Sequence, residues 1–300
     1  MTSQRLTADL AFLGHMCFDE VIPFGGSPRV APGSAVLCGA LAAARIGTSV
    51  AVVTRMAPQD EEILTPMRQS GIAVHVIPAD VTTYMRVVHT SADVDERQID
   101  QLANAGPFSL SAIPALFVHQ VHLAGITDQE FDLDFVRGMK ARGYRLSADM
   151  QSWVRQVDPA TRRVSFGDVA NKAELARLLD IVKLDVVEAR VLTETDDLER
   201  AAIVFEEWGC PEVVITRADG VLARVNGKTY WEPFSNRSVV GRTGRGDTTF
   251  AAYMARRLDH DPDESLRFAA ALVSIKMEKA GPFDGTLADV LERMNTTAAR

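Results

Sequence analysis

The sequence predicts an α/β fold in which a mostly parallel sheet lies between two layers of helices. Short, continuously apolar stretches alternate with amphipathic, helix-forming stretches along most of the chain. Strands without a polar face are typical of parallel sheets that are covered on both sides, and the intervening helices provide that cover. The 300 residues, of which 47% are hydrophobic and 24% charged, suffice for a sizeable core.

The alternation assigns the elements in order. The predicted strands are Leu10–Leu13, Val50–Thr54, Val118–Leu123, Arg145–Ala148, Ile181–Val187 and Glu212–Thr216. The predicted helices are Gly33–Ile46, Glu61–Gln69, Leu133–Arg142, Lys172–Leu179, Asp196–Trp208, Thr248–Leu258 and Pro262–Glu278. Because parallel neighbours need a crossover connection, this order indicates successive βαβ units.

Two stretches interrupt the alternation. Residues 17–31 and residues 82–103 carry alternating polar and apolar side chains with turn residues between them. This pattern is typical of antiparallel strands with one exposed face. We expect the two stretches to pair as a small β lid over one edge of the main body, with an ordinary surface hairpin as the alternative. No linker divides the chain, so we expect one domain over residues 1–300.

Composition narrows the function. A net charge of −8 and an isoelectric point near 5.3 argue against nucleic acid as a partner. The most apolar region, Ala35–Val53, is too short and too broken to span a membrane, and the N-terminus does not resemble a signal peptide. Cys17, Cys38 and Cys210 form no CxxC pair. These features predict a reduced, cytoplasmic protein without a zinc site.

The stretch RTGRGDTTFAAYMARRL, residues 242–258, predicts an anion-binding site. Apolar residues recur at helical spacing from Phe250, so the turn at residues 244–246 leads into a helix N-terminus. Unpaired backbone N–H groups and the helix dipole attract an anion there. Asp247 beside them can accept a proton from an attacking hydroxyl, which suits phosphoryl transfer. The alternative is an aspartate that caps the helix.

This stretch resembles the C-terminal signature of the ribokinase-like (PfkB) family of sugar and nucleoside kinases, usually D-T-x-G-A-G-D-x-F. PGSAVLCGALAAARIG (residues 32–47) is similar to the family's N-terminal signature. VKLDVVEARVLT (residues 182–193) resembles the segment that usually carries N-x-x-E, and VVITRADGVLA (residues 213–223) the strand and turn before the nucleotide pocket. The interrupting stretches fall where this family inserts its lid.

The resemblance implies a ribokinase-like fold and an ATP- and Mg²⁺-dependent kinase that phosphorylates a hydroxyl of a sugar, polyol or nucleoside. It implies that Asp247 is the catalytic base and that Gly244, Arg245 and Gly246 form the anion hole for the γ-phosphate. Arg245 stands where the family usually has alanine. Its backbone N–H is retained, and its guanidinium adds a cation that can reach phosphate or point into solvent.

The resemblance also implies the metal and nucleotide residues. Glu188 holds the place of the glutamate that organises Mg²⁺ through water. Asp185 replaces the asparagine of N-x-x-E, and an acid there can still hold hydrated Mg²⁺. Thr216 and Gly220 fall in the segment that touches the nucleotide.

For the acceptor, the resemblance assigns Asp19 to the substrate hydroxyls and places Gly33, Ser34 and Cys38 in the same pocket. Ser34 replaces the second glycine of a Gly-Gly pair, and Cys38 stands where many sugar kinases have a hydroxyl-binding asparagine. Cysteine is only a weak donor, and Cys17 near Asp19 is another. This pocket is expected to differ from that of a ribose kinase.

Such a pocket favours a neutral substrate with an apolar or flat part, such as a nucleoside, or one recognised mainly by Tyr84, Arg86 and Arg97 of the lid. Since family members often pack lid against lid, we expect a homodimer. The alternative function is a non-catalytic sugar- or nucleotide-sensing protein on the same fold. The retained Asp247 argues against that alternative, because a dead site has no need of a base.

Overall fold

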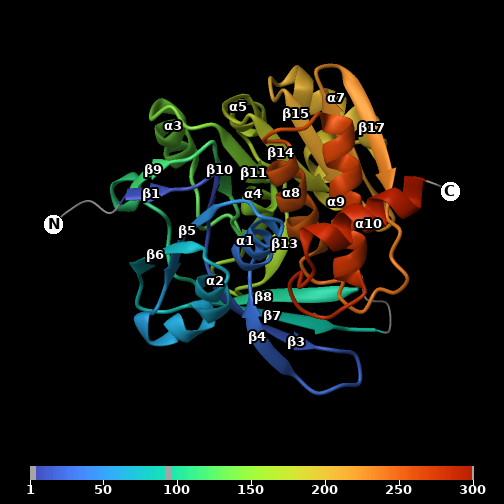
Figure 1. Cartoon of the computed structure of the whole chain (residues 1–300). Coiled ribbons are helices and arrows are strands. Elements are labelled where there is room, and N and C mark those ends of the chain that lie inside the picture. The colour runs from blue at the N-terminus through green and yellow to red at the C-terminus, as the bar shows by residue number, and fades with distance from the viewer. Residues whose placement is uncertain (1–4, 92–95, 299–300) are drawn as a thin grey trace.

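The computed structural model describes residues 5–91 and 96–298 and has the predicted layers (Figure 1). Its main sheet has the order β17 (Lys228–Pro233), β16 (Gly220–Val225), β15 (Glu212–Thr216), β14 (Ile181–Asp185), β11 (Leu146–Asp149), β10 (Gln120–Leu123), β2 (Leu10–Leu13), β5 (Val50–Met56) and β6 (Ala73–Pro78). The pairs from β6 to β15 are parallel, and β16 and β17 continue the sheet as an antiparallel hairpin.

Helices cover both faces of this sheet. One face carries α1 (Ala35–Arg45), α2 (Thr65–Gln69), α8 (Arg245–Arg256), α9 (Pro262–Met277) and α10 (Leu287–Ala298). The other carries α3 (Leu133–Ala141), α5 (Lys172–Leu178), α6 (Val186–Thr193) and α7 (Leu198–Glu207). Phe12 and Leu13 are successive residues of β2, yet each is buried in a different core cluster. Double coverage explains why the strands have no polar face.

Shorter elements complete the chain. They are β1 (Arg5–Thr7), paired with β9 (Ala115–Phe117), the hairpin of β12 (Arg155–Val157) and β13 (Val164–Phe166), the helix α4 (Gln151–Val154) and the 3₁₀ helices η1 (Pro58–Leu64) and η2 (Leu110–Ala112). Within the described residues, no helix is long and apolar enough to cross a membrane. All three cysteines are buried and free.

Two predicted boundaries were wrong in ways that matter for the site. The strand expected at Ile181–Val187 ends at Asp185, because the Asp185 carboxylate caps α6 and Val186 already belongs to that helix. The helix expected from Thr248 begins at Arg245 instead. Each correction moves acidic side chains from a strand or a loop into the first turn of a helix.

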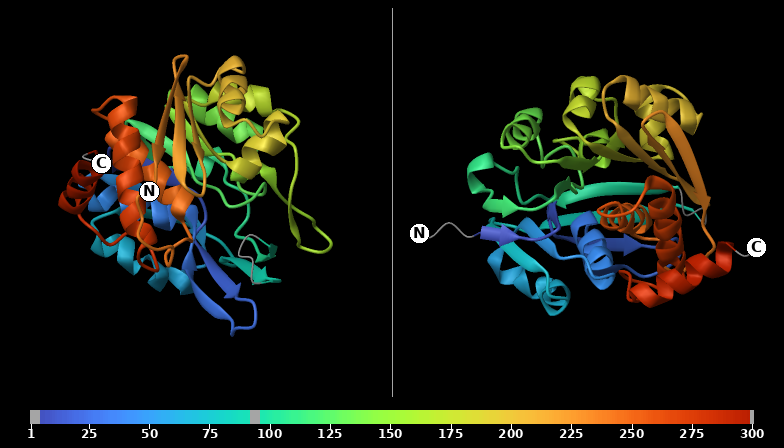
Figure 2. Two further views of the ribbon diagram at one scale, coloured as in Figure 1. Left: turned by 90° about the vertical axis from the view of Figure 1, so that its right-hand side faces the viewer. Right: turned by 45° about the horizontal axis from the view of Figure 1, so that its top comes forward.

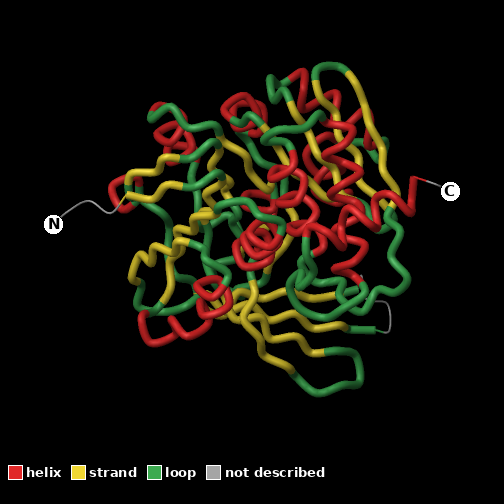
Figure 3. The backbone as a smooth tube through the Cα atoms, viewed as in Figure 1, coloured by secondary structure: helices red, strands yellow, loops and turns green. Residues whose placement is uncertain are grey.

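The two interrupting stretches form one four-stranded lid (Figure 3). Its order is β4 (Arg29–Gly33), β3 (Cys17–Ile22), β7 (Thr83–His89) and β8 (Arg97–Ala103). The central pair, β3 and β7, is parallel rather than antiparallel, because each strand leaves the main body at the same edge. Figure 2 shows β3 and β4 projecting from the body. Residues 92–95 of the second stretch lie outside the described residues.

Candidate active site

The glycine turn forms the N-terminus of α8. Gly244 is the residue before the helix, with a φ of 74° in the left-handed region that glycine adopts without strain. The first helical hydrogen bond runs from the Thr248 N–H to the Gly244 carbonyl, at 3.0 Å. The amides of Gly246 and Asp247 precede that bond and are available for an anion, whereas the Arg245 amide, expected in the anion hole, donates to the Arg242 carbonyl at 3.2 Å. Asp247 is the third residue of α8, and within the described residues the N-cap position, Gly244, makes no side-chain capping bond.

Both glycines of the turn lie close to side chains from other elements. A Cβ atom on Gly244 would be 2.5 Å from Cys38 Sγ of α1, and one on Gly246 would be 3.1 Å from Lys183 Nζ of β14. The first contact is too short for any side chain at residue 244. The turn therefore packs against α1 on one side and against the end of β14 on the other.

Lys183 and Asp149 form a buried ion pair that the sequence analysis missed. Lys183 Nζ lies 2.7 Å from Asp149 Oδ2, and the two side chains are 5% and 1% exposed. Burial alone would lower the pKa of Lys183, but the carboxylates of Asp149, Glu188 and Asp247 together raise it above its ordinary value. A permanent cation thus lies beside Gly246. The sequence does carry a signal for it that was not used, a lysine inside a continuously apolar strand.

Asp185 and Glu188 meet at the N-terminus of α6. They form a capping box: Asp185 Oδ1 accepts from the Val187 and Glu188 amides, and Glu188 Oε2 accepts from the Asp185 amide. Glu188 Oε1 is buried and has no hydrogen-bond partner among the described residues. Burial, reinforced by the Asp185 carboxylate, raises the pKa of Glu188 to about 8. A nearby cation would stabilise this carboxylate.

The lid contributes Asp19 to the same region. A Cβ on Gly33 would overlap Asp19 Oδ2, and the Cys17 thiol donates to Asp19 Oδ1 at 3.4 Å. Burial raises the pKa of Asp19, and the Asp247 carboxylate adds to that effect while Arg155 opposes it. Arg155, also missed in the sequence, has a buried Nε without a partner in the part of the chain that the structure describes. The lid thus brings Asp19 within electrostatic reach of Asp247.

Ser34 and Cys38 offer little to a hydroxyl-rich ligand. Ser34 Oγ accepts from the Leu37 amide at 3.0 Å and caps α1, and it also donates to Met16 Sδ. Burial, followed by the Asp247 carboxylate, raises the pKa of Cys38 to about 12, so its thiol stays neutral. Neither side chain is therefore a strong hydrogen-bonding group at this position.

The two residues expected at the nucleotide lie at the adjacent ends of β15 and β16, where Thr216 pairs with Val221. Thr216 ends β15, and a Cβ on Gly246 would be 3.7 Å from its hydroxyl, so Thr216 belongs to the anion-hole region. Gly220 begins β16, where a Cβ would lie 2.4 Å from the Trp231 ring. The glycine is required there by packing against β17. Arg217 also lies over the Trp231 ring and pairs with Asp219.

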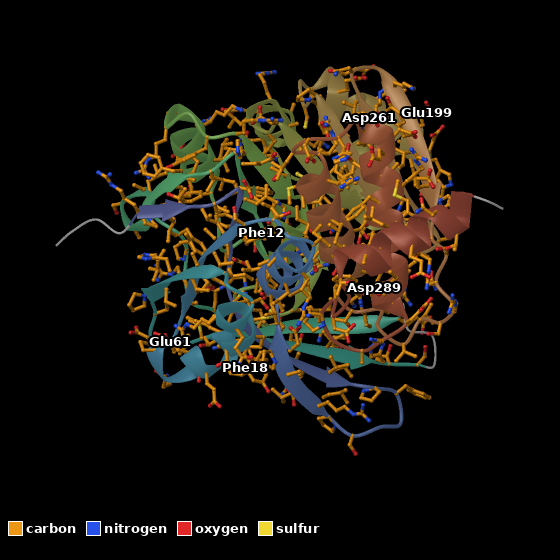
Figure 4. All side chains as sticks on the ribbon, viewed as in Figure 1. Phe12, Phe18, Glu61, Glu199, Asp261 and Asp289 are labelled. Carbon is orange, nitrogen blue, oxygen red and sulfur yellow. The ribbon has the colours of Figure 1, made fainter. Side chains whose placement is uncertain are left out.

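Two of the lid residues expected to recognise substrate lie on the wrong face for that role. In the parallel register of β3 and β7, Phe18 pairs with Tyr84 and Glu20 with Arg86, whereas Asp19 pairs with Met85. Arg86 Nε donates to Glu20 Oε2 at 2.6 Å. Tyr84 and Arg86 therefore share the outer face with Phe18, which is labelled in Figure 4, and not the Asp19 face.

A family model described as the pfkB family carbohydrate kinase matches residues 7–287. Among curated proteins, the cytidine kinase of Thermococcus kodakarensis is 26% identical over 260 residues, which cover 82% of this chain and 87% of that protein. The family match includes the lid, the main sheet and the α8 turn, so every element that builds the site lies within it.

Solved structures agree on the fold. A pyrophosphate-dependent kinase in the ribokinase family, in complex with sulfate, has a TM-score of 0.86 at 29% identity and covers 95% of this chain and 99% of that chain. A pyrophosphate-dependent kinase in the ribokinase family, complexed with a pyrophosphate analog and myo-inositol, has a TM-score of 0.83 at 27% identity, with 94% and 99% covered. The predicted ribokinase-like fold is confirmed.

Proposed function

Because the chain belongs to the pfkB family of carbohydrate kinases and is a kinase, we propose a role for each group at the α8 turn. Asp247 accepts the proton of an acceptor hydroxyl. The amides of the turn and the Lys183 ammonium hold the phosphoryl group in transfer. The observation that carries this proposal is the position of Asp247 in the first turn of α8, next to the Gly246 amide at the helix N-terminus.

The step is an in-line displacement. The acceptor oxygen attacks the phosphorus atom as its proton moves to Asp247. The bond from that phosphorus to the bridging oxygen breaks, and the leaving phosphate keeps the electron pair. The amides of Gly246 and Asp247 and the buried Lys183 ammonium stabilise the negative charge on the equatorial oxygens. Donors fixed in this way are worth about 10²–10³ in rate each.

Mg²⁺ fits the pair at the start of α6. Glu188 Oε1 is buried without a partner, and Glu188 and Asp185 are adjacent carboxylates, so a hydrated dication would offset their repulsion. When bound, Mg²⁺ neutralises charge on the donor phosphates. Glu188→Gln keeps the capping geometry and removes the charge. We expect it to raise the Mg²⁺ concentration that gives half-maximal rate, and an unchanged Mg²⁺ dependence would contradict this role.

We favour pyrophosphate as the donor over ATP, the donor expected from the family resemblance. Kinases that use pyrophosphate share 27% and 29% of their residues with this chain. Arg245 also supports a small, highly charged donor, because it adds a cation at the anion hole where the family usually has alanine. It lies within electrostatic reach of Asp219, on the side of the β15–β16 turn.

Initial rates measured with pyrophosphate and with ATP decide which of the two is the preferred donor. With a common acceptor, we expect a higher kcat/KM with pyrophosphate than with ATP, and Arg245→Ala should lower the pyrophosphate value more. A higher kcat/KM with ATP would assign the donor role to the nucleotide.

For the acceptor we propose a neutral polyol or nucleoside. Asp19 provides a carboxylate for two hydroxyls, and the thiols of Cys17 and Cys38 near it are neutral and only weakly polar. Relatives include a cytidine kinase and a kinase complexed with myo-inositol. Release of product should be measured over a panel of inositols, cytidine, pentoses and a sugar phosphate. Preference for the sugar phosphate would contradict a neutral acceptor.

We also propose that two copies pair through their lids. The outer lid face holds a shallow cavity of about 500 Å³ lined by Phe18, Tyr84 and Leu102 together with Arg86. Val30, on the neighbouring strand β4, is 54% exposed. A second lid would cover this apolar surface. Sedimentation should give a dimer at micromolar concentration, and Tyr84→Glu should give monomers. A wild-type monomer would contradict this pairing.

A further inference from the structure

Lys276 is a buried lysine behind the anion hole. It lies in the last turn of α9, is 2% exposed, and its Nζ donates to the backbone carbonyls of Gly241 and Thr243. These carbonyls belong to the segment that leads directly into the α8 turn. Burying an ammonium is costly unless strong acceptors replace its water. Here the carbonyls of Gly241 and Thr243 are the acceptors that replace water.

The same segment is fixed to the end of α9 by a second contact. The Gly241 N–H donates to the Met277 carbonyl at 2.8 Å. A Cβ on Gly241 would overlap the Lys279 carbonyl, so only glycine allows this approach. Gly241 is therefore held on both sides, by its N–H and by its carbonyl.

The Thr243 carbonyl links Lys276 to the anion hole. In a trans peptide the C=O and the following N–H point in opposite directions. A hydrogen bond that holds the Thr243 carbonyl on the Lys276 side therefore directs the Gly244 N–H to the other side. Gly244 in turn fixes the start of α8, since its own carbonyl accepts the first helical bond from Thr248. The orientation of the whole turn depends on this peptide plane.

Two charged side chains near the α8 turn act on the pKa of Lys276. Burial lowers the pKa of Lys276, whereas the Asp247 carboxylate acts in the opposite direction and Arg245 adds to the lowering. Asp247 and Cys38 are the groups that contact or flank the turn itself. The positive charge of Lys276 therefore lies on the side of residues 241–244 opposite to the proposed phosphoryl site.

We propose that Lys276 is a positioning residue: an internal cation that holds residues 241–244 in the geometry that binds an anion. This inference rests on the proposed function of the α8 turn and extends it to α9. Lys276 does not touch the reacting atoms. It acts through the carbonyls of Gly241 and Thr243, and a small external cation bound between these carbonyls can replace its ammonium.

Chemical rescue tests the proposal. Lys276→Ala opens space for a small amine, and Lys279→Ala is the matched control, because Lys279 lies three residues further on and its side chain is 64% exposed. We expect Lys276→Ala to lower kcat by about 10²-fold, the effect of losing a fixed anion-hole donor, with a smaller change in the acceptor KM. Ammonium or methylammonium should restore kcat with saturation, whereas tetramethylammonium is too large to enter and should not.

Binding of pyrophosphate, followed by calorimetry, separates this proposal from the proposed function. Wild-type protein that binds pyrophosphate, with Lys276→Ala binding weakly and ammonium restoring affinity, supports the inference even without turnover. Unchanged kcat and affinity in Lys276→Ala would overturn it. The proposal would also be overturned if Lys276→Ala is folded, as checked by circular dichroism, and no amine restores its kcat or its affinity for pyrophosphate. If Lys276→Ala does not fold, Lys276→Gln, which keeps N–H donors but removes the charge, must lower both kcat and the affinity for pyrophosphate, and wild-type values in that variant would overturn the proposal.

Discussion

Ser34 stores backbone strain that glycine would release. Its φ of 137° and ψ of 160° fall in a region that is essentially restricted to glycine, and such a residue costs about 1–3 kcal/mol. Two effects oppose the gain from Ser34→Gly. Exchanging a serine cap for glycine loses a few tenths of a kcal/mol, roughly 0.3. The added freedom of the unfolded chain costs about 0.4–1 kcal/mol.

The balance predicts that Ser34→Gly stabilises the protein by about 1 kcal/mol if the strain is near the middle of its range. This corresponds to a rise in Tm of about 2 °C for a chain of this length. Ser34→Ala is the control. It keeps the strained backbone but removes the hydrogen bond to the Leu37 amide, so it should cost about 1 kcal/mol.

Thermal unfolding followed by circular dichroism would measure both variants, with urea midpoints as the second readout. The two substitutions should shift stability in opposite directions. If Ser34→Gly destabilises the protein as much as Ser34→Ala, the strain is absent and the cap alone determines the effect. The acceptor KM of Ser34→Gly should stay near the wild-type value, because the hydroxyl is committed to α1.

Three further predictions concern Asp247, Lys183 and His122. Asp247→Asn should lower kcat by about 10²–10⁴-fold and leave donor binding intact, as measured by calorimetry; near wild-type kcat would remove its role as base. Lys183→Met should cost about 3–5 kcal/mol of stability in urea, since it leaves the Asp149 charge buried and unpaired; a neutral effect would mean that Asp149 takes up a proton instead. Burial lowers the pKa of His122 to about 3, so the unfolded chain binds a proton below about pH 6.5 that the folded chain refuses, and stability falls as pH falls. Between pH 7 and pH 5 the wild type should therefore lose about 2 kcal/mol more than His122→Gln, and parallel pH profiles in urea would refute this.

The sequence predicted what is encoded locally. The α8 turn and Asp247 lie in one continuous stretch, so their adjacency required no tertiary information. The strands were recognisable because burial on both faces removes polar residues, as in Phe12 and Leu13 of β2. The lid was recognisable because its strands keep an alternating pattern.

Contacts between distant segments were not predictable in this way. Lys183 and Asp149 come from neighbouring strands that are 34 residues apart in the chain. Lys276 reaches carbonyls more than 30 residues before it. A sequence pattern gives the period of a strand but not the register with its partner. For that reason the outward position of Tyr84 could not be read before β3 and β7 were paired.

Phosphorus NMR of the protein with pyrophosphate, Mg²⁺ and a neutral acceptor such as myo-inositol tests the central claim most directly. It observes donor, product and leaving group in one sample, and Asp247→Asn provides the matched reference. The account predicts that a phosphomonoester and orthophosphate appear together in the wild-type sample, while Asp247→Asn leaves the pyrophosphate unconsumed. Equal rates of phosphomonoester formation in the two samples would contradict the assignment of Asp247 as the base at the α8 anion hole.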